Sequence, residues 1–318
     1  MYKKMCELSI VIPVFNEEKN IGLLYKKLVE SLKAIGRTYE IIFVDDGSSD
    51  NSFSLLKQIH ENDASVKVLK LFCNMGKAVA YSAGFDAAKG EIIITMDADL
   101  QDDPQDIKAL LDKLYGGYDM VTGWKYTGKG TLMKTVPSRI FNGFVRFITG
   151  IHVHDLNCPF KAYRRNVLKG LYIYGDLYRF ITLILASKGY KIAEVKIKNY
   201  PRNLGKTKYG VSRFGKGFLD FITVIFITKY ASRPLHFFGL IGSAIFFCGF
   251  GIDAYITMRG LLVGRIGHSA MLLFGVLLMI TGIQLISIGI IAELMINLNR
   301  KEERDFNIEL ILDNDSVK

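Results

Sequence analysis

The sequence is poor in the residues that build disulfide scaffolds and zinc sites. It has four cysteines among 318 residues, and none of them stands in a Cys-x-x-Cys pair. We therefore expect neither a disulfide framework nor a cysteine zinc site. Zinc-finger spacings, RNP-like aromatic motifs and basic helical arms are also lacking, which argues against nucleic acid as a partner. The net charge of +10 then favours an anionic lipid surface or a phosphate-bearing substrate.

Two further features are lacking near the amino terminus. Residues 13–17 (PVFNE) follow the first apolar run, where a nucleotidyl transferase would carry a Gly-rich phosphate loop. The apolar run itself is short, and no small-residue cleavage site follows it, in contrast to a secretory signal peptide. We therefore expect the amino-terminal domain to stay in the cytoplasm.

Long apolar runs are confined to the last third of the chain. Residues 235–252 and 269–292 contain no Asp, Glu, Lys or Arg. Because about 20 apolar residues cross a hydrocarbon core, we predict two transmembrane helices, at about 234–256 and 269–295. Glycines recur in both runs and would permit close helix contact. The predicted divisions of the chain are a globular domain at 1–210, a juxtamembrane amphipathic helix at 211–232, the hairpin at 233–296 and a tail at 297–318.

Basic residues flank the outer ends of this predicted hairpin: Lys229, Arg233, Arg300, Lys301 and Arg304. Loops and tails rich in Lys and Arg remain on the cytoplasmic side of a membrane. Because the linker between the two apolar runs is short, both chain ends share one side. We therefore expect a two-helix protein of the inner or plasma membrane, with the globular domain and both termini in the cytoplasm.

Apolar strand-like runs alternate with helical patterns through the first half of the chain. The predicted strands are residues 8–13, 40–44, 66–72, 91–96 and 119–123, and the predicted helices are 17–35, 52–62, 77–88 and 106–114. Strands that alternate with helices of this length form right-handed crossovers and a mainly parallel sheet. Near-continuous Ile, Val and Leu in the strands indicates that helices cover both faces of this α/β sheet.

Polar side chains follow these strands at the points where they end. Asp97 and Asp99 stand one residue apart after the run 91–96. The carboxyl ends of the strands are where ligands bind in open α/β sheets, and paired carboxylates there can hold a divalent cation beside a diphosphate. The same edge would collect Asn16, Glu17, Asp45, Asp46 and Asn74. The pattern predicts a nucleotide-sized crevice, whereas the Asp97–Asp99 pair alone would also fit a solvated turn.

Two basic amphipathic patterns lie between the sheet and the apolar runs. Residues 132–148 and 214–230 place apolar side chains at helical spacing, with Lys and Arg elsewhere. Helices of this kind often lie in a membrane interface. The alternative is that each packs against the sheet.

Six segments in order resemble the signatures of family 2 glycosyltransferases. More narrowly they resemble the polyprenyl-phosphate glycosyltransferases, which include dolichyl-phosphate mannose synthases and bacterial undecaprenyl-phosphate sugar transferases. The segments are residues 10–18 (IVIPVFNEE), 44–50 (VDDGSSD), 74–77 (NMGK), 97–101 (DADLQ), 155–165 (DLNCPFKAYRR) and 202–209 (RNLGKTKY). The closing hairpin is similar to that of the bacterial members, so the resemblance covers almost the whole chain and implies a nucleotide-sugar-binding domain of GT-A type.

This resemblance implies a nucleotide-sugar donor, Mg²⁺ or Mn²⁺, and a polyprenyl phosphate acceptor. By motif match the donor site comprises Pro13, Phe15, Glu17, Val44, Asp46, Lys77, Asp97, Ala98, Arg202 and Lys208. The metal would lie among Asp97, Asp99 and Gln101, and the acceptor phosphate beside Lys125, Lys134 and Ser138. Lys125 and Lys134 stand where arginine is common in the family, so point charges replace fork-like phosphate contacts.

The expected catalytic carboxylates are Asp97, Asp99 and Asp155. Asp155 could orient or deprotonate the acceptor, or it could have a structural role paired with Arg164 or Arg179. A phosphate monoester has a second pKa of about 6, so it is largely ionised near neutral pH and needs no strong base. In-line attack by this phosphate would invert the anomeric centre.

The sequence thus predicts inverting transfer of a single hexose to undecaprenyl phosphate at the cytoplasmic membrane face. A UDP-sugar such as UDP-glucose is the favoured donor, with GDP-mannose as the alternative. A processive polysaccharide synthase is disfavoured, because the only tryptophan is Trp124 and no Gln-x-x-Arg-Trp motif exists. A catalytically inactive membrane scaffold is the alternative of another class. Because Gly-rich hairpins are associated with helix-mediated assembly in this family, the resemblance further implies a homo-oligomer.

Overall fold

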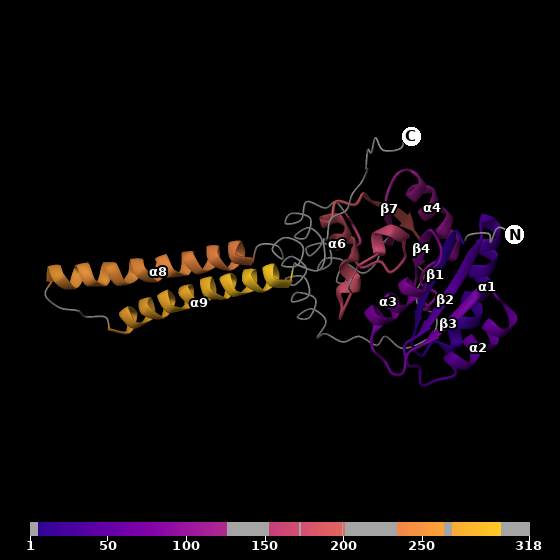
Figure 1. The fold of residues 1–318 in the computed structure, drawn as a ribbon, viewed down its shortest axis with the longest axis horizontal. Coiled ribbons are helices and arrows are strands. Elements are labelled where there is room, and N and C mark those ends of the chain that lie inside the picture. The colour runs from indigo at the N-terminus through magenta and orange to yellow at the C-terminus, as the bar shows by residue number, and fades with distance from the viewer. Residues whose placement is uncertain are drawn as a thin grey trace, which may run out of the picture. The chain divides into compact units, whose positions relative to one another are not determined.

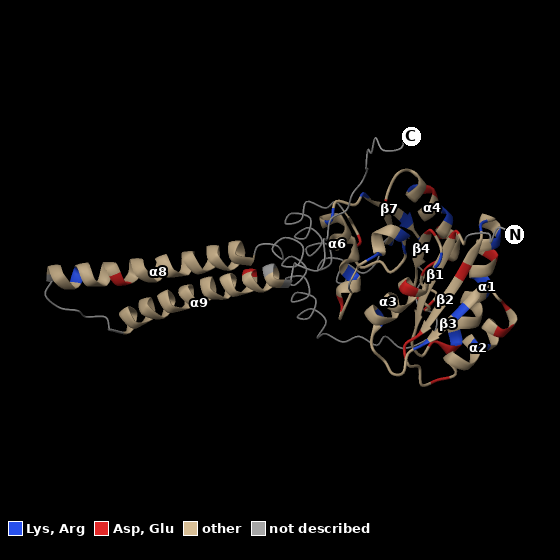
Figure 2. Ribbon diagram, viewed as in Figure 1, with Lys and Arg blue, Asp and Glu red and all other residues tan. Residues whose placement is uncertain are grey.

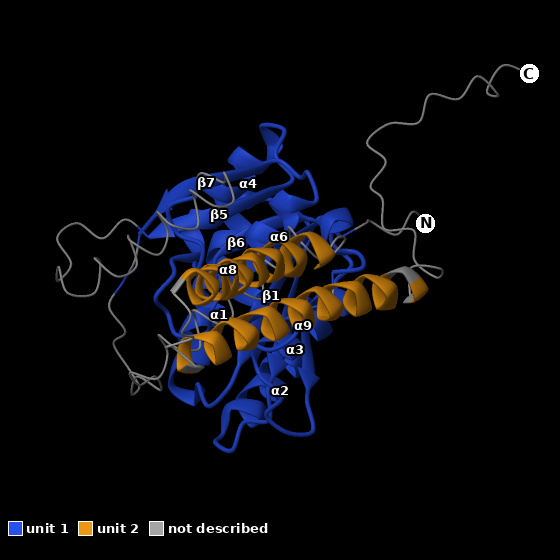
Figure 3. Cartoon of the chain, turned by 90° about the vertical axis from the view of Figure 1, so that its left-hand side faces the viewer, with its two compact units in different colours: residues 1–224 blue, residues 225–318 orange. Residues whose placement is uncertain are grey.

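The computed structural model describes residues 6–125, 153–171, 173–198, 200, 234–263 and 269–299. The chain divides into two compact units, Met1–Val224 and Ile225–Lys318, which are considered separately (Figure 3). The amphipathic helices expected at 132–148 and 214–230 lie outside the described residues, so they stay predictions.

The first unit contains a seven-stranded sheet with the order β3-β2-β1-β4-β6-β5-β7. Figure 1 labels β1, β2, β3, β4 and β7 of this sheet. Its strands are β1 (Leu8–Val14), β2 (Tyr39–Asp45), β3 (Val66–Lys70), β4 (Ile92–Thr95), β5 (Met120–Lys125), β6 (Lys161–Arg164) and β7 (Ile192–Ile197). β1 pairs in parallel with both β2 and β4, and β2 pairs in parallel with β3. These pairings confirm the mainly parallel α/β sheet that the sequence predicts.

The sequence analysis did not predict two strands of this sheet. β6 lies antiparallel between β4 and β5, and β7 lies at the sheet edge beside β5. β6 is short and contains Lys161 and Arg164, while β7 alternates apolar residues with Glu194 and Lys196. Neither has the continuous apolar run that marks a strand covered on both faces.

Helices cover both faces of the sheet, as predicted. α1 (Glu18–Ile35) buries a stripe of Ile and Leu at helical spacing in one apolar core, together with residues of α2 (Ser52–Asn62) and α4 (Ile107–Tyr115). α3 (Lys77–Ala87) packs on the opposite face. There Gly84 lies so close to Val11 and Val44 that a Cβ atom at this position would overlap the Val11 side chain.

The described residues of this unit also include short 3-10 segments and one further helix. They are η1 (Pro104–Asp106), η2 (Arg165–Leu168), η3 (Leu177–Phe180) and α6 (Ile181–Ser187). Asp103 begins η1 by accepting a hydrogen bond from the backbone N–H of Gln105 at 3.1 Å.

The second unit contains two long apolar helices, α8 (Pro234–Val263) and α9 (Ser269–Asn299). Figure 2 shows that charged residues are almost absent from both. The spans Pro234–Leu262 and Ala270–Ile296 are long and apolar enough to cross a membrane. Glu293 accepts a hydrogen bond from the backbone N–H of Leu235 at 3.2 Å, so its carboxylate satisfies a donor in the first turn of α8.

Glycines bring α8 and α9 into backbone contact. A Cβ atom at Gly249 would lie 2.5 Å from the carbonyl oxygen of Gly275, and one at Gly242 would lie 2.7 Å from that of Gly282. Small residues allow such contacts where no hydrophobic effect drives helices together. These four glycines therefore serve packing within the chain, and the expected homo-oligomer stays a prediction.

Gly249→Leu should separate the two helices of the hairpin. The larger side chain would meet the α9 backbone, and overpacking of this kind costs about 1–3 kcal/mol. We expect a lower melting temperature for the helical circular dichroism signal in detergent. Gly251→Leu is the matched control, because nothing lies within 4 Å of a Cβ atom there. Equal melting temperatures for the two variants would contradict the glycine contact.

Candidate active site

The sheet carries a pocket at the point where its chain order reverses. From β1 the chain continues through β2 and β3 on one side, and it then returns to place β4 on the other side. Ligands bind at such switch points, outside the carboxyl ends of the strands. The described lining residues are Pro13, Val14, Phe15, Glu17, Asp46, Asn74, Gly76, Lys77, Asp97, Ala98 and Asp99. The polar clusters that follow the first four strands therefore meet at one edge, as the sequence predicts.

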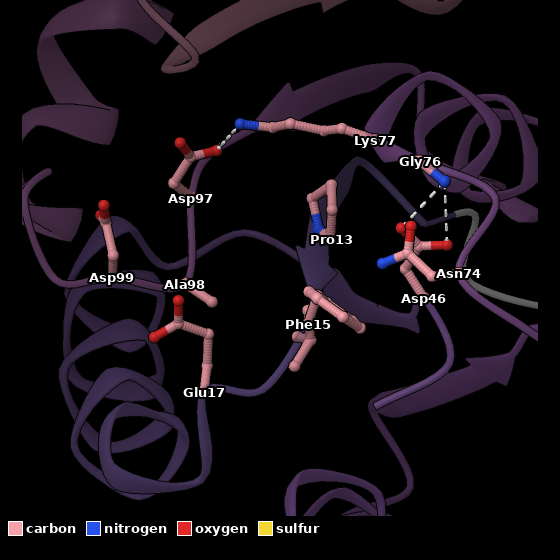
Figure 4. Close-up of a pocket in the computed structure, with 11 residues that line it drawn as sticks. Pro13, Phe15, Glu17, Asp46, Asn74, Gly76, Lys77, Asp97, Ala98 and Asp99 are labelled. Atoms are coloured by element: carbon pink, nitrogen blue, oxygen red, sulfur yellow. Dashed lines mark hydrogen bonds and ion pairs between the residues drawn. The ribbon is translucent and has the colours of Figure 1, made fainter. Parts of the chain in front are cut away.

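Asp46 binds the backbone of the loop after β3, and this loop forms one wall of the pocket. Its carboxylate accepts a hydrogen bond from the backbone N–H of Met75 at 2.8 Å. It also accepts one from the backbone N–H of Gly76 at 3.0 Å (Figure 4). Burial raises the pKa of Asp46, and the two backbone donors oppose this effect. Gly47, at φ +68°, lies so near the Cys73–Asn74 backbone that a Cβ atom would be 2.5 Å from the Cys73 carbonyl carbon. This position therefore needs glycine.

The segment after β1 is tied to the segment after β2. Asn16 adopts φ +55°, a left-handed conformation that asparagine tolerates better than most residues. Its backbone N–H donates to Ser48 Oγ at 3.0 Å, and its side-chain oxygen accepts from the Ser49 N–H at 2.8 Å. The backbone N–H of Glu17 donates to Ser52 Oγ at 2.9 Å. These contacts fix the segment that presents Phe15 and Glu17 to the pocket.

The opposite wall combines a lysine with the first carboxylate after β4. Lys77, at the start of α3, forms an ion pair with Asp97 (Figure 4). The Lys77 ammonium also lies 5.6 Å from the ring centroid of Tyr81 and 5.4 Å from that of Tyr178. Rings at these distances attract an ammonium group through cation–π contacts. The ion pair and the two rings therefore hold the Lys77 ammonium beside Asp97.

Asp99 lines the same pocket two residues after Asp97. Asp99 Oδ1 accepts a hydrogen bond from the backbone N–H of Gln101 at 3.2 Å. Leu100 between them adopts φ +61°. A bulky residue in this conformation costs about 1–3 kcal/mol and such strain is concentrated at functional sites. The turn lets Asp99 face the pocket while the Gln101 carbonyl accepts a hydrogen bond from the Tyr200 N–H at 3.0 Å.

Asp97 and Asp99 form an all-oxygen donor pair that suits Mg²⁺ or Mn²⁺. Within the described part of the chain, no group of three or more His, Cys, Asp or Glu side chains could enclose a metal ion. Magnesium is commonly held by one or two carboxylates, with substrate phosphates and water completing its shell. The two carboxylates at the pocket fit this open mode of binding.

A second lysine–carboxylate pair lies beside this wall. Lys125 Nζ, from the last residue of β5, is 2.8 Å from Asp102 Oδ1. Burial raises the pKa of Asp102 to about 6, although the Lys125 charge opposes this shift. Burial lowers the pKa of Lys125, but its interactions with Asp102, Cys158 and Asp97 together raise it by more, so the net direction is upward.

Asp155 lies in the segment that leads into β6. Its carboxylate accepts a hydrogen bond from the Asn157 N–H at 3.2 Å, and burial raises its pKa against the charges of Lys161 and Lys125. Neither arginine proposed as its structural partner forms an ion pair with it within the described residues. Arg164 donates to the carbonyl oxygen of Tyr118 at 3.0 Å, and Arg179 pairs with Asp176 at 3.3 Å. The positively charged neighbours of Asp155 are therefore Lys161 and Lys125.

The structure brings most of the predicted donor residues together. Pro13, Phe15, Glu17, Asp46, Lys77, Asp97 and Ala98 line one pocket, together with Asp99 of the predicted metal site. Val44 is buried in β2 below α3, and the lining does not include it. Four predicted residues lie outside the described ranges: Lys134, Ser138, Arg202 and Lys208.

Sequence reasoning assigned no site role to Val14, Gly76 or Asp102. Val14 and Gly76 line the pocket, and Asp102 pairs with Lys125. The signal for Asp102 was its place next to Gln101 in an acidic run, but the sequence does not reveal which of these acids is buried.

A family model described as "Glycosyl transferase family 2" matches residues 9–171. A dodecaprenyl-phosphate galacturonate synthase of Rhizobium johnstonii is 34% identical over 91% of this chain and 87% of the relative. An undecaprenyl-phosphate 4-deoxy-4-formamido-L-arabinose transferase of Pseudomonas paraeruginosa is 32% identical over 90% of this chain and 84% of the relative.

Solved structures share the fold of the first unit. Glucosyl-3-phosphoglycerate synthase of Mycobacterium tuberculosis, determined with Mn²⁺ and uridine-diphosphate-glucose, superimposes with a TM-score of 0.52 at 18% identity. The match covers 70% of this chain and 79% of that structure. Mannosyl-3-phosphoglycerate synthase of Rubrobacter xylanophilus gives a TM-score of 0.54 at 15% identity, over 69% of this chain and 73% of that structure.

Lys161, a buried residue of β6, should make stability depend on pH. Burial lowers its pKa from 10.5 to about 8, so between these values the unfolded chain holds a proton that the folded chain has lost. The free energy of unfolding should then rise with pH across this window, by on the order of 1 kcal/mol per pH unit. Urea unfolding from pH 8 to 10 should show this rise in the wild type relative to Lys161→Met. Parallel curves for the two proteins would contradict it.

Proposed function

Because the chain belongs to glycosyl transferase family 2, we propose that it transfers one sugar from a nucleoside-diphosphate sugar to a polyprenyl phosphate. The observation that carries the proposal is the pocket at the β1–β4 switch point, where Asp97 and Asp99 stand beside Lys77. The relatives named above, which match over most of both chains, support the polyprenyl phosphate acceptor. An inactive scaffold would have no reason to keep this constellation of charges.

The pocket has walls suited to the parts of a nucleotide sugar. The Phe15 and Glu17 segment and the loop held by Asp46 would enclose the base and ribose. The Lys77 ammonium would lie near the diphosphate, where it offsets negative charge in a partly dehydrated site. Asp97 and Asp99 would hold Mg²⁺ or Mn²⁺, with Gln101 beside them. When bound, such an ion acts as a Lewis acid on the oxygens of a leaving diphosphate.

The transfer requires one bond to form and one to break. A phosphate oxygen of the acceptor bonds to the anomeric carbon of the sugar, while the bond from this carbon to the diphosphate oxygen breaks. The nucleoside diphosphate departs with the electron pair. No proton need move, because an acceptor phosphate with a second pKa of about 6 is already a dianion near neutral pH. In-line attack inverts the anomeric centre, and the main task of the protein is to position the two reactants.

Lys125 is the described residue best suited to receive the acceptor phosphate. Its ammonium lies beside the carboxylate wall, and the Asp97 charge is one of the influences that raise its pKa. A cation at this point would attract the acceptor and reduce the repulsion between two phosphate-bearing substrates. Asp155, close to Lys125, would then orient the acceptor side of the site rather than serve as a necessary base.

The names of the relatives widen the choice of sugar beyond the hexose glucose. One name contains galacturonate, an acidic sugar, and the other contains 4-deoxy-4-formamido-L-arabinose, a pentose with an amide. We propose a UDP-sugar from this wider group, with UDP-glucose and GDP-mannose as competing donors. The two apolar helices would anchor the enzyme in the membrane that holds its lipid acceptor, with the globular domain and both termini in the cytoplasm.

A donor panel tests the reaction and identifies the sugar. The full chain, in detergent with undecaprenyl phosphate and Mg²⁺ or Mn²⁺, should be incubated with radiolabelled UDP-glucose, UDP-galacturonate, UDP-4-deoxy-4-formamido-L-arabinose or GDP-mannose. We expect label from one UDP-sugar in the lipid extract, in a product sensitive to mild acid. Label from GDP-mannose alone would overturn the choice of nucleotide. Nucleotide release with no labelled lipid from any donor would overturn the proposed acceptor.

Asp99→Ala should abolish sugar transfer while membrane insertion is retained. Asp99 is one of the two carboxylates that would hold the metal ion, and loss of one preorganised electrostatic contribution of this kind typically costs about 10²–10³-fold in rate. The measurement is labelled lipid formed per minute at saturating donor, with insertion checked by alkaline extraction of membranes. Asp86→Asn is the control, because Asp86 is exposed on α3 outside the pocket lining. Turnover near that of the wild type in Asp99→Ala would refute the role of this carboxylate.

A further inference from the structure

The Asp102–Lys125 pair stands out among the ion pairs of the described residues by its burial. The Asp102 side chain is 0% exposed and the Lys125 side chain is 18% exposed, whereas most other pairs keep at least one partner a third or more exposed. Lys125 ends β5, and Asp102 lies in the turn that follows β4. Because β6 separates these two strands, the pair bridges over an intervening strand.

A contribution to folding stability does not explain why this buried ion pair is present. A buried ion pair often gains no more than the desolvation of its two charges costs. Asp102 Oδ2 is buried and has no hydrogen-bond partner within the described residues, which adds an unsatisfied acceptor. A core built for stability would place apolar side chains here. The pair is better explained by the role proposed for Lys125, which is to receive the acceptor phosphate beside the neighbouring pocket.

The pair adjoins the carboxylate wall of that pocket. The charges of Asp97 and Asp99 act on Asp102, and the charge of Asp97 acts on Lys125. The strained turn at Leu100 lies between two carboxylates with different surroundings. Asp99, before the turn, lines the pocket, whereas Asp102, after it, is buried. One short segment therefore supplies a carboxylate to the donor pocket and another to the lysine beside it.

We propose that Asp102 is a positioning residue, whose carboxylate holds the Lys125 ammonium where the acceptor phosphate docks. A lysine ammonium is a single charge on a flexible four-carbon stem, and it lacks the planar fork with which arginine fixes a phosphate. A buried carboxylate at 2.8 Å restricts that stem to one arrangement before the acceptor arrives. This inference rests on the proposed function, because it assigns the acceptor phosphate to Lys125.

A double-mutant cycle tests the inference on the full-length protein. Asp102→Asn keeps the side-chain shape and removes the charge, Lys125→Met removes the ammonium, and the third variant combines both. We expect Asp102→Asn to raise the KM for undecaprenyl phosphate by about tenfold to a hundredfold, because a displacement of about 1 Å has effects of this size. The KM for the donor should change less than about twofold, which a general loss of structure would not achieve.

The combined variant decides whether Asp102 acts through Lys125. In the Lys125→Met background, Asp102→Asn should change the acceptor KM by less than about twofold, because residues in one network are not additive. Asp112→Asn, exposed on α4, should leave both KM values unchanged. Effects of the two substitutions that multiply, or a donor KM that rises together with the acceptor KM, would overturn the inference.

A second variant covers the case in which Asp102→Asn does not fold, and the wild type separates failure of this inference from failure of the proposed function. If Asp102→Asn does not fold, Asp102→Glu keeps the charge but moves the ammonium by about one methylene, and it should raise the acceptor KM severalfold with the donor KM unchanged. An unchanged acceptor KM in that variant would also overturn the inference. If the wild type itself transfers no sugar to the lipid, the proposed function fails. If the wild type transfers sugar and Asp102→Asn behaves like Asp112→Asn, only the role of Asp102 fails.

Discussion

The reversal of chain order between β1 and β4 is the constraint on which the site depends. The crossovers after β1 and β4 leave in opposite directions, so a space opens at the carboxyl ends of these two strands. Asp46, Asp97 and Asp99 enter that space because each directly follows a strand or lies within a few residues of its end. The sheet core, with its fully buried Ile and Val residues, holds the strand ends in place. A preformed pocket of this kind needs little reorganisation when charge moves within it.

Around this pocket the fold places lysines beside buried or half-buried acids. Lys77 accompanies Asp97, Lys125 accompanies Asp102, and Lys161 lies near Asp155. Isolated charges at this depth would be strongly penalised, so carboxylates and ammonium groups occur together. The distribution leaves lysines along the wall where a diphosphate and a phosphate are proposed to meet. The lysines that offset the cost of desolvating these acids are thus the same groups that suit a reaction between two phosphate-bearing substrates.

The two apolar helices obey a different set of physical rules. Their side chains are apolar on every face, as expected where lipid replaces water. Backbone contact at Gly249 and Gly242 then replaces the hydrophobic effect as the basis of helix packing. Membrane anchoring of the second unit agrees with relatives whose names specify polyprenyl phosphate acceptors.

Local patterns in the sequence were sufficient for most of the architecture. Continuous apolar runs identified the first five strands and both long helices, and the acids after the strands identified the pocket edge, because each feature depends on residues close together in the chain. β6 and β7 were missed, since short or alternating strands take their stability from pairing partners. The meeting of Asp102 with Lys125, and of Lys77 with Asp97, was likewise decided only in the folded protein. The sequence by itself determined which chemical groups reach the edge of the sheet, whereas the tertiary structure decided which of them become partners, because strand order sets the distances between residues far apart in the chain.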